Sequence, residues 1–257
     1  MTTERIEELF AKTLIGDVDD DAPWEAVREL HRIGSREVFA RAAEWCKSND
    51  PLVRARGIDV LAQLGKTVNH PTNSFPEESY SIVTGLLHQE RELRPLIAAI
   101  AALGHLDNPL AIPLITEYRT HPSADIRFHV ACALGSFPND PRSAGTLLVL
   151  AQDADEDVRD WATFGLGSLG DLDSPEIRDA LFRRLSDSNE DVREEAIAGL
   201  GKRQDKRVLP ALLAALERPP VTDRVVEAAY RMLNMENERK DWGASEYAAA
   251  LRERFRL

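Results

Sequence analysis

The sequence predicts an all-α solenoid built from about seven copies of a two-helix repeat. Three observations predict this fold: a repeated motif, a helical spacing of apolar residues inside each copy, and the overall composition. The stretch DEDVRDWATFGLGSLGD at 155–171 shares nine of its 17 residues with NEDVREEAIAGLGKRQD, 34 residues later at 189–205. Related stretches are SADIRFHVACALGSFPN at 123–139 and DPLVRARGIDVLAQLGK at 50–66. This period is typical of stacked helical repeats.

Within each copy, apolar and small residues recur at helical spacing, as in Val158, Ala162, Leu166 and Leu169. We name this first helix of a copy helix A. A second amphipathic stretch, helix B, follows a turn and is predicted at 36–47, 108–119, 174–186 and 206–217. Weaker or divergent copies of helix A lie at 22–35, 91–107 and 222–235. One helix pair cannot bury its apolar face alone, so neighbouring copies are expected to stack into a single domain over 1–257.

The two ends are predicted to cap the stack. Residues 1–21 are expected to form a cap helix and an acidic loop, residues 22–235 the repeats, and residues 236–257 a second cap helix. The first cap carries an apolar stripe and the last one repeats an apolar residue every four positions. These stripes are Ile6, Leu9, Phe10, Thr13 and Leu14, and then Tyr247, Leu251 and Phe255.

The composition is that of a folded chain with a sizeable core: 257 residues, 43% hydrophobic and 30% charged. The apolar run LIAAIAALG at 96–104 is far shorter than the roughly 18 residues of a membrane span. The first residues, MTTERIEELFAKTL, contain no apolar signal core. We therefore expect no membrane association and a cytoplasmic location, with Cys46 and Cys132 as reduced, buried thiols.

The formal net charge is −12, and the acidic residues are spread along the chain. Nucleic-acid affinity depends mainly on Lys and Arg contacts to phosphates, so this charge argues against a nucleic-acid partner. It leaves a basic protein partner as one option.

The pattern D-x-x-V-R-x-x-A-x-x-x-L-G-x-L-G, carried best by 155–170, resembles the HEAT-like repeats of the phycobilin-lyase type. The resemblance covers roughly residues 22–235 and implies an α-solenoid. It also implies a protein from a group that consists mostly of adaptors and scaffolds with a few enzymes, so the activity must be argued from particular sites.

The Val-Arg step of the motif recurs through the chain. An Arg at the start of helix A can fork onto Asp side chains or backbone carbonyls of an adjacent repeat, so we expect these residues to hold the repeats in register. An anion-binding row is the alternative. The residues are Arg28, Arg54, Arg127, Arg159 and Arg193.

Acidic clusters precede several A helices. DADED at 153–157 and DSNED at 187–191 are expected to cap and favour helix N-termini, with recognition of a basic partner as the alternative. DVDDD at 17–21 starts like a calcium loop, but Ala22 stands at the required Gly position and Arg28 at the position of the bidentate Glu. We interpret it as an acidic loop before the first repeat helix.

The sequence contains no recognisable catalytic or metal motif. Its six histidines fit no zinc spacing, and no phosphate loop, G-x-S-x-G turn or nucleophilic Cys context occurs. We expect no metal and no cofactor. The insertion KTVNHPTNSFPEE at 66–78 adds about ten residues to one turn and is interpreted either as a partner-contacting edge or as a tolerated surface loop.

Aromatic residues at helix A positions give the sharpest hypothesis. The position of Trp161 is held by Arg56, His129 and Glu195 in other copies, which indicates a solvent-facing position. Phe164 aligns with Asp59, and Phe128 aligns with Asp160 and Glu194. We therefore predict a partner-binding patch of Trp161, Phe164, Phe128 and His129. Alternatively, these rings extend the core over a neighbouring repeat.

The sequence as a whole favours a non-enzymatic scaffold or adaptor, monomeric, with a protein or peptide partner. Two other functions remain open. One is a bilin-lyase-like enzyme, whose chemistry depends on a shaped groove rather than a short motif. The other is a stoichiometric inhibitor or immunity-type protein for a basic target.

Overall fold

The computed structural model describes residues 2–16, 20–235 and 241–257. Within these ranges the regular elements are all helical, as predicted. They fall into two compact units, 1–136 and 137–257, which are described separately. That the two units form a single domain over residues 1–257 stays a prediction.

The first unit contains a cap helix, the helices of the first three copies and helix A of the fourth. They are α1 (Thr3–Lys12), α2 (Asp21–Ile33), α3 (Arg36–Trp45), α4 (Pro51–Ala62), α5 (Pro76–Leu87), α6 (Leu93–His105), α7 (Ala111–Thr116) and α8 (Ala124–Gly135).

The second unit contains the remaining repeats and the other cap helix. Its elements are α9 (Pro141–Leu150), α10 (Glu156–Phe164), the π-helical turn η1 (Gly165–Leu169), α11 (Pro175–Arg184), α12 (Glu190–Lys202), the 3₁₀ turn η2 (Lys206–Val208), α13 (Leu209–Leu216), α14 (Asp223–Met232) and α15 (Ala244–Phe255). The four ranges predicted for helix B correspond to α3, α7, α11 and η2 with α13.

Capping side chains start the A helices where the acidic clusters predicted them. Asp155 accepts hydrogen bonds from the backbone N–H groups of Asp157 and Val158 at 3.1 and 3.2 Å. Asn189 caps α12 in the same way. The capping role is therefore confirmed for these two clusters, because each cap satisfies N–H groups that have no partner inside the helix.

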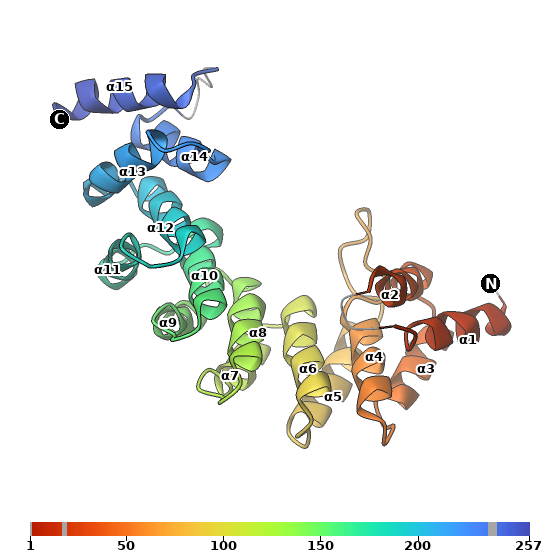
Figure 1. Cartoon of the computed structure of the whole chain (residues 1–257). Helices are drawn as coiled ribbons and strands as arrows, with labels where there is room; N and C mark the ends of the chain where they lie inside the picture. Colours follow the sequence, from red (N-terminus) through yellow and green to blue (C-terminus); the bar gives the residue numbers. More distant parts are fainter. Residues whose placement is uncertain (1, 17–19, 236–240) are drawn as a thin grey trace. The chain divides into compact units, whose positions relative to one another are not determined.

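The A helices stack directly on one another inside each unit. Figure 1 shows α4, α6 and α8 side by side in the first unit, and α10, α12 and α14 in the second. α12 approaches η1 closely, because a Cβ atom on Gly199 would lie 2.6 Å from Cα of Gly167. The Gly of the Leu-Gly step thus lets two backbones meet.

The cap helices bury most of the stripes predicted for them, whereas Leu14 and Phe255 are half-buried. Ile6, Leu9 and Phe10 of α1 are buried, and the Phe10 ring lies 4.8 Å from that of Trp45. Tyr247 and Leu251 of α15 are buried beside α13 and α14. Part of each predicted terminal segment, including Asp17, Asp19 and 236–240, lies outside the described residues.

The insertion at 66–78 contains one well-anchored side chain. Asn73 is buried, and its side-chain amide donates to the backbone oxygen of Leu61 at 2.7 Å. Val68, further along the loop, is fully exposed. Contact between this insertion and a partner stays a prediction.

Candidate partner-binding surface

One face of α10 carries two aromatic rings. Trp161 and Phe164 pack edge to face, with ring centroids 5.5 Å apart and an interplanar angle of 87°. Trp161 keeps 37% of its surface exposed and Phe164 is half-buried. Val158 and Ala162 lie on the opposite, core-facing side of the helix and are fully buried. The two rings therefore belong to the surface face of α10.

The expectation that the Trp161 position faces solvent in the other copies is wrong for two of them. Arg56 is 3% exposed and Glu195 is 5% exposed. The Arg56 guanidinium donates to the backbone oxygen of Thr13 at 2.9 Å. Glu195 accepts from the hydroxyl of Ser168 at 2.6 Å. These charged groups are buried because neighbouring elements supply partners, which the alignment of copies could not show.

Phe128 and His129 form a second aromatic pair, on α8 of the first unit. Their ring centroids lie 5.1 Å apart with an interplanar angle of 76°, and both residues are half-buried. The His129 ring nitrogen Nδ1 is 2.7 Å from the backbone oxygen of Asp125. Each unit thus supplies one pair, and joint action of the four residues stays a prediction.

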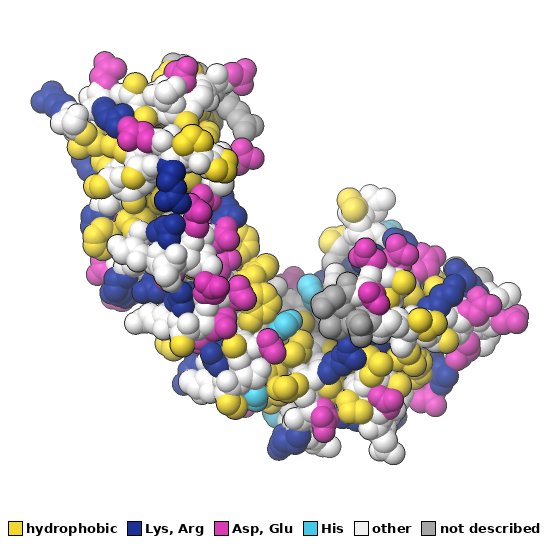
Figure 2. Space-filling model, viewed as in Figure 1, with side chains coloured by type: hydrophobic (Ala, Val, Ile, Leu, Met, Phe, Trp, Pro, Cys, Tyr) yellow, Lys and Arg dark blue, Asp and Glu magenta, His cyan; other side chains and the backbone are white. Residues whose placement is uncertain are grey.

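Acidic groups surround the surface face of α10 and the adjoining face of α12. Asp191 and Glu195 share Arg224, which approaches them at 3.7 and 2.8 Å. Burial raises the pKa of Glu195 above its ordinary value. Burial, followed by the charge of Asp191, also raises the pKa of Asp160. Figure 2 shows acidic side chains in magenta over these helices, with hydrophobic ones in yellow beside them.

Arg159 forms a bidentate ion pair with Asp187, in the turn that begins the next repeat. Its Nε and Nη2 atoms donate to Oδ2 and Oδ1 of Asp187 at 2.9 and 3.0 Å. Its Nη1 atom donates to two backbone oxygens in the turn before α10. Burial raises the pKa of Asp187, but the hydrogen bonds from Arg159 and neighbouring groups outweigh it, so the pKa lies below its ordinary value. This pair ties α10 to the turn that precedes α12.

The other motif arginines repeat parts of this geometry. Arg54 forks onto Glu90, with hydrogen bonds of 2.9 and 3.1 Å. Arg127 and Arg193 each donate to two carbonyls in the turn before their own helix. Arg28 is exposed. The role of these arginines in holding the repeats in register stays a prediction, which these contacts support.

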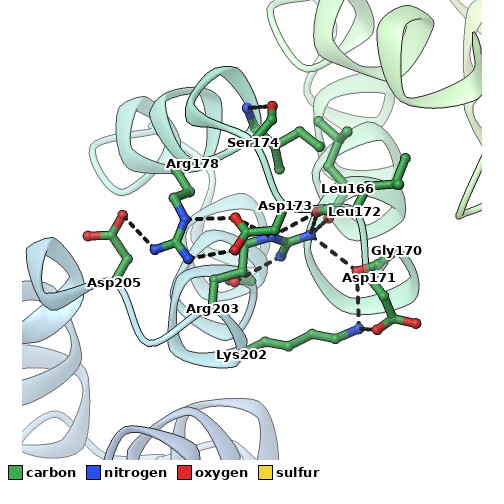
Figure 3. Close-up of polar contacts among 12 residues, drawn as sticks. Leu166, Gly170, Asp171, Leu172, Asp173, Ser174, Arg178, Lys202, Arg203 and Asp205 are labelled. Carbon is green, nitrogen blue, oxygen red and sulfur yellow. Dashed lines mark hydrogen bonds and ion pairs between the residues drawn. The ribbon is translucent and has the colours of Figure 1, made fainter. Parts of the chain in front are cut away.

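Sequence reasoning missed Arg203, although it is 8% exposed and has many partners. Its guanidinium donates to backbone oxygens within η1, in the following turn and in α12, namely those of Leu166, Gly167, Gly170, Leu172 and Gly199. Beside it, Lys202 donates to Gly170 and pairs with Asp171 at 2.7 Å (Figure 3). The available signal was a cation at the place that Leu169 holds 34 residues earlier.

Burial makes the two cysteines poor nucleophiles. Cys46 and Cys132 are free, and burial raises the pKa of each thiol to about 12. A thiolate is therefore scarce at neutral pH. Within 2–16, 20–235 and 241–257, no three or more His, Cys, Asp or Glu side chains gather as a metal site. In the same ranges, no helix is both long and apolar enough to cross a membrane.

Comparisons with known proteins agree with this architecture. The family model of HEAT repeats matches residues 81–167 and 145–234. Protein YibA of Escherichia coli strain K12 is 30% identical over 229 residues, which cover 87% of this chain and 79% of that protein. Phycocyanobilin lyase subunit alpha of Thermosynechococcus vestitus is 28% identical over 152 residues, which cover 59% of this chain and 55% of that protein.

Solved structures show the same fold. The X-ray structure of Escherichia coli YibA matches with a TM-score of 0.72 at 26% identity, over 96% of this chain and 92% of that chain. The complex of CpcE and CpcF of phycocyanin lyase from Nostoc sp. PCC7120 matches with a TM-score of 0.51 at 14% identity, over 97% and 94%. The predicted α-solenoid is confirmed, and the chain belongs to the HEAT-repeat family, with repeats of the phycobilin-lyase type.

Proposed function

We propose that the chain is a non-enzymatic scaffold that binds a protein or peptide partner through the surface face of α10. The observation that carries this proposal is the edge-to-face pair of Trp161 and Phe164 with the indole 37% exposed. Aromatic anchors of this kind, and Trp in particular, supply much of the binding energy in protein interfaces. Stacked repeats present such anchors on extended surfaces. In this proposal the chain acts as a monomer in the cytoplasm, which agrees with its free cysteines.

Affinity capture tests the proposal. The full chain is immobilised and exposed to a lysate of its host, and the bound proteins are identified by mass spectrometry. Trp161→Ala should lose a specific set of proteins that the parent retains, because it removes the anchor. Phe182→Ala is the matched control, since Phe182 is 43% exposed on α11 of the same unit. Capture of the same proteins by the Trp161→Ala chain would contradict the proposal.

A bilin-lyase-like activity is the second candidate, and the similarity to the phycocyanobilin lyase subunit favours it. Incubation with a bilin and an unmodified phycobiliprotein, followed by denaturing electrophoresis with fluorescence detection, tests it directly. Covalent transfer that depends on the chain would replace the scaffold proposal with an enzymatic one.

A further inference from the structure

The surface face of α10 carries acidic groups next to its aromatic pair. Asp157, Asp160, Trp161 and Phe164 are spaced i, i+3, i+4 and i+7, so they share one face of the helix. On the adjacent helix α12, Asp191 is close enough to Asp160 for its charge to raise the pKa of that carboxyl. We call these five residues the acidic-aromatic face.

The negative charge of this face is only partly compensated. Arg224 of α14 pairs with Glu195 at 2.8 Å, whereas its distance to Asp191 is 3.7 Å. Among the described residues, Asp157 and Asp160 form no direct ion pair, although the charge of Arg224 opposes the effect of burial on the pKa of Asp160. The Asp160 atom Oδ1 is buried and lacks a hydrogen-bond partner in the described structure. A cation brought by a partner would therefore approach carboxylates whose negative charge Arg224 balances only in part.

The first unit shows what such a cation does beside an indole and a carboxylate. Arg56, which aligns with Trp161 among the repeats, lies with its guanidinium 4.6 Å from the centre of the Trp24 ring. The same guanidinium pairs with Asp59 at 3.2 Å. Arginine suits this environment because its planar group stacks on aromatic rings while its N–H groups fork onto carboxylates. The acidic-aromatic face presents the same two chemical groups to an incoming side chain.

We propose that the acidic-aromatic face binds a basic peptide segment of the partner, with an Arg or Lys side chain over Trp161 and its charge facing Asp160 and Asp191. This inference rests on the proposed function and names the chemistry of its partner. Charge complementarity selects this occupant, since an acidic segment would be repelled by the same carboxylates. The overall charge of −12 acts in the same direction at longer range.

Panning of a random dodecapeptide library on phage tests the inference even while the natural partner is unidentified. The immobilised full chain should enrich peptides with more Arg and Lys than the starting library. The double variant Asp160→Asn/Asp191→Asn should reduce recovery of these peptides at least fivefold, and Trp161→Leu should reduce it as well. A second variant, Trp161→Phe, keeps an aromatic surface and should retain part of the binding, and thermal melts establish that each variant is folded.

A matched control separates local from overall charge. The double variant Glu176→Gln/Glu253→Gln changes the net charge by the same amount as Asp160→Asn/Asp191→Asn. Glu176 lies in the first turn of α11, and Glu253 lies within α15. This control should bind the enriched peptides as the parent does. Replacing each Arg of the best peptide with uncharged citrulline should weaken its affinity at least tenfold.

The outcomes distinguish this inference from the function on which it rests. Enriched peptides that need Trp161 but contain no excess of basic residues would overturn the inference and leave the binding function intact. Equal loss of binding in the acidic double variant and its control would also overturn it. Enriched peptides that bind the Trp161 variants and the acidic double variant as well as the parent, or no enrichment at all, would overturn both the inference and the proposed binding function.

Discussion

At the scale of single residues, equivalent arginines of the repeat have different surroundings. Arg159 and Arg193 occupy the same motif position and both donate to two carbonyls of the preceding turn. Of these two, only Arg159 also donates two hydrogen bonds to a carboxylate, that of Asp187, whose side chain is 4% exposed. Arg193 lies 3.9 Å from Glu190, an exposed group of its own helix. The motif predicts the contacts to the preceding turn that both arginines share. The contact to Asp187 depends on the residue that the next repeat carries at that position.

We expect Arg159→Ala to destabilise the protein by about 2–3 kcal/mol, because it leaves Asp187 with fewer partners in a buried position. Arg184 still pairs with Asp187 at 2.9 Å, which limits the loss. Arg193→Ala should cost only about 1 kcal/mol. Urea melts measure both values. Equal losses would show that the fork onto Asp187 adds nothing.

Asp59 makes stability depend on pH. Burial raises its pKa to about 6, against the opposing effect of Arg56, whereas an unfolded Asp titrates near 4. The folded state therefore binds the proton more tightly, and this contribution to stability is lost as the pH rises through 6. Between pH 5 and 7.5 the parent should lose about 1 kcal/mol relative to Asp59→Asn. Urea melts of both proteins at the two pH values measure the difference, and parallel pH profiles would contradict it.

The misjudged Trp161 position has a physical explanation at this same scale. A sequence pattern shows that Arg56 and Glu195 are charged, and charged residues are mostly exposed. It does not show that Thr13 and Ser168 supply partners from other elements. The exposed Trp161 thus differs from its aligned residues in environment as well as in type.

At the scale of helices, the apolar spacing and the caps predicted the A and B helices well. Both signals are local, so they do not depend on which neighbours each helix packs against. The π-helical turn at Gly165–Leu169 and the burial of Arg203 were not predicted. The burial of Arg203 depends on backbone oxygens of the preceding repeat, those of Leu166, Gly170 and Leu172 (Figure 3), which the local pattern around Arg203 does not contain.

The glycines of the Leu-Gly step provide a test of helix stacking. Gly199→Ala should destabilise the protein by about 1–3 kcal/mol even though Ala favours a helix, because its Cβ would lie 2.6 Å from Cα of Gly167. Gly145→Ala on α9 is the control, since a Cβ there meets nothing within 4 Å. It should stabilise the protein by about 0.5–1 kcal/mol. Thermal melts that show the same sign for both variants would refute the close approach.

At the scale of the whole molecule, the net charge of −12 restricts the class of partner. We expect the affinity for labelled single-stranded or duplex oligonucleotides to be weaker than about 1 µM at physiological salt, because few cations are available to displace counterions from phosphates. Fluorescence anisotropy measures this affinity. Submicromolar binding would mean that Lys and Arg gather on one face despite the overall charge.

The central claim is that a protein partner contacts the surface face of α10, and site-specific photo-crosslinking tests it most directly. Benzoylphenylalanine is placed at position 161 in the full chain, or at position 182 as an equally aromatic and exposed control, and the cells are irradiated. Our account predicts a discrete protein adduct from position 161 that position 182 does not form. No adduct from position 161, or the same adducts from both positions, would contradict it.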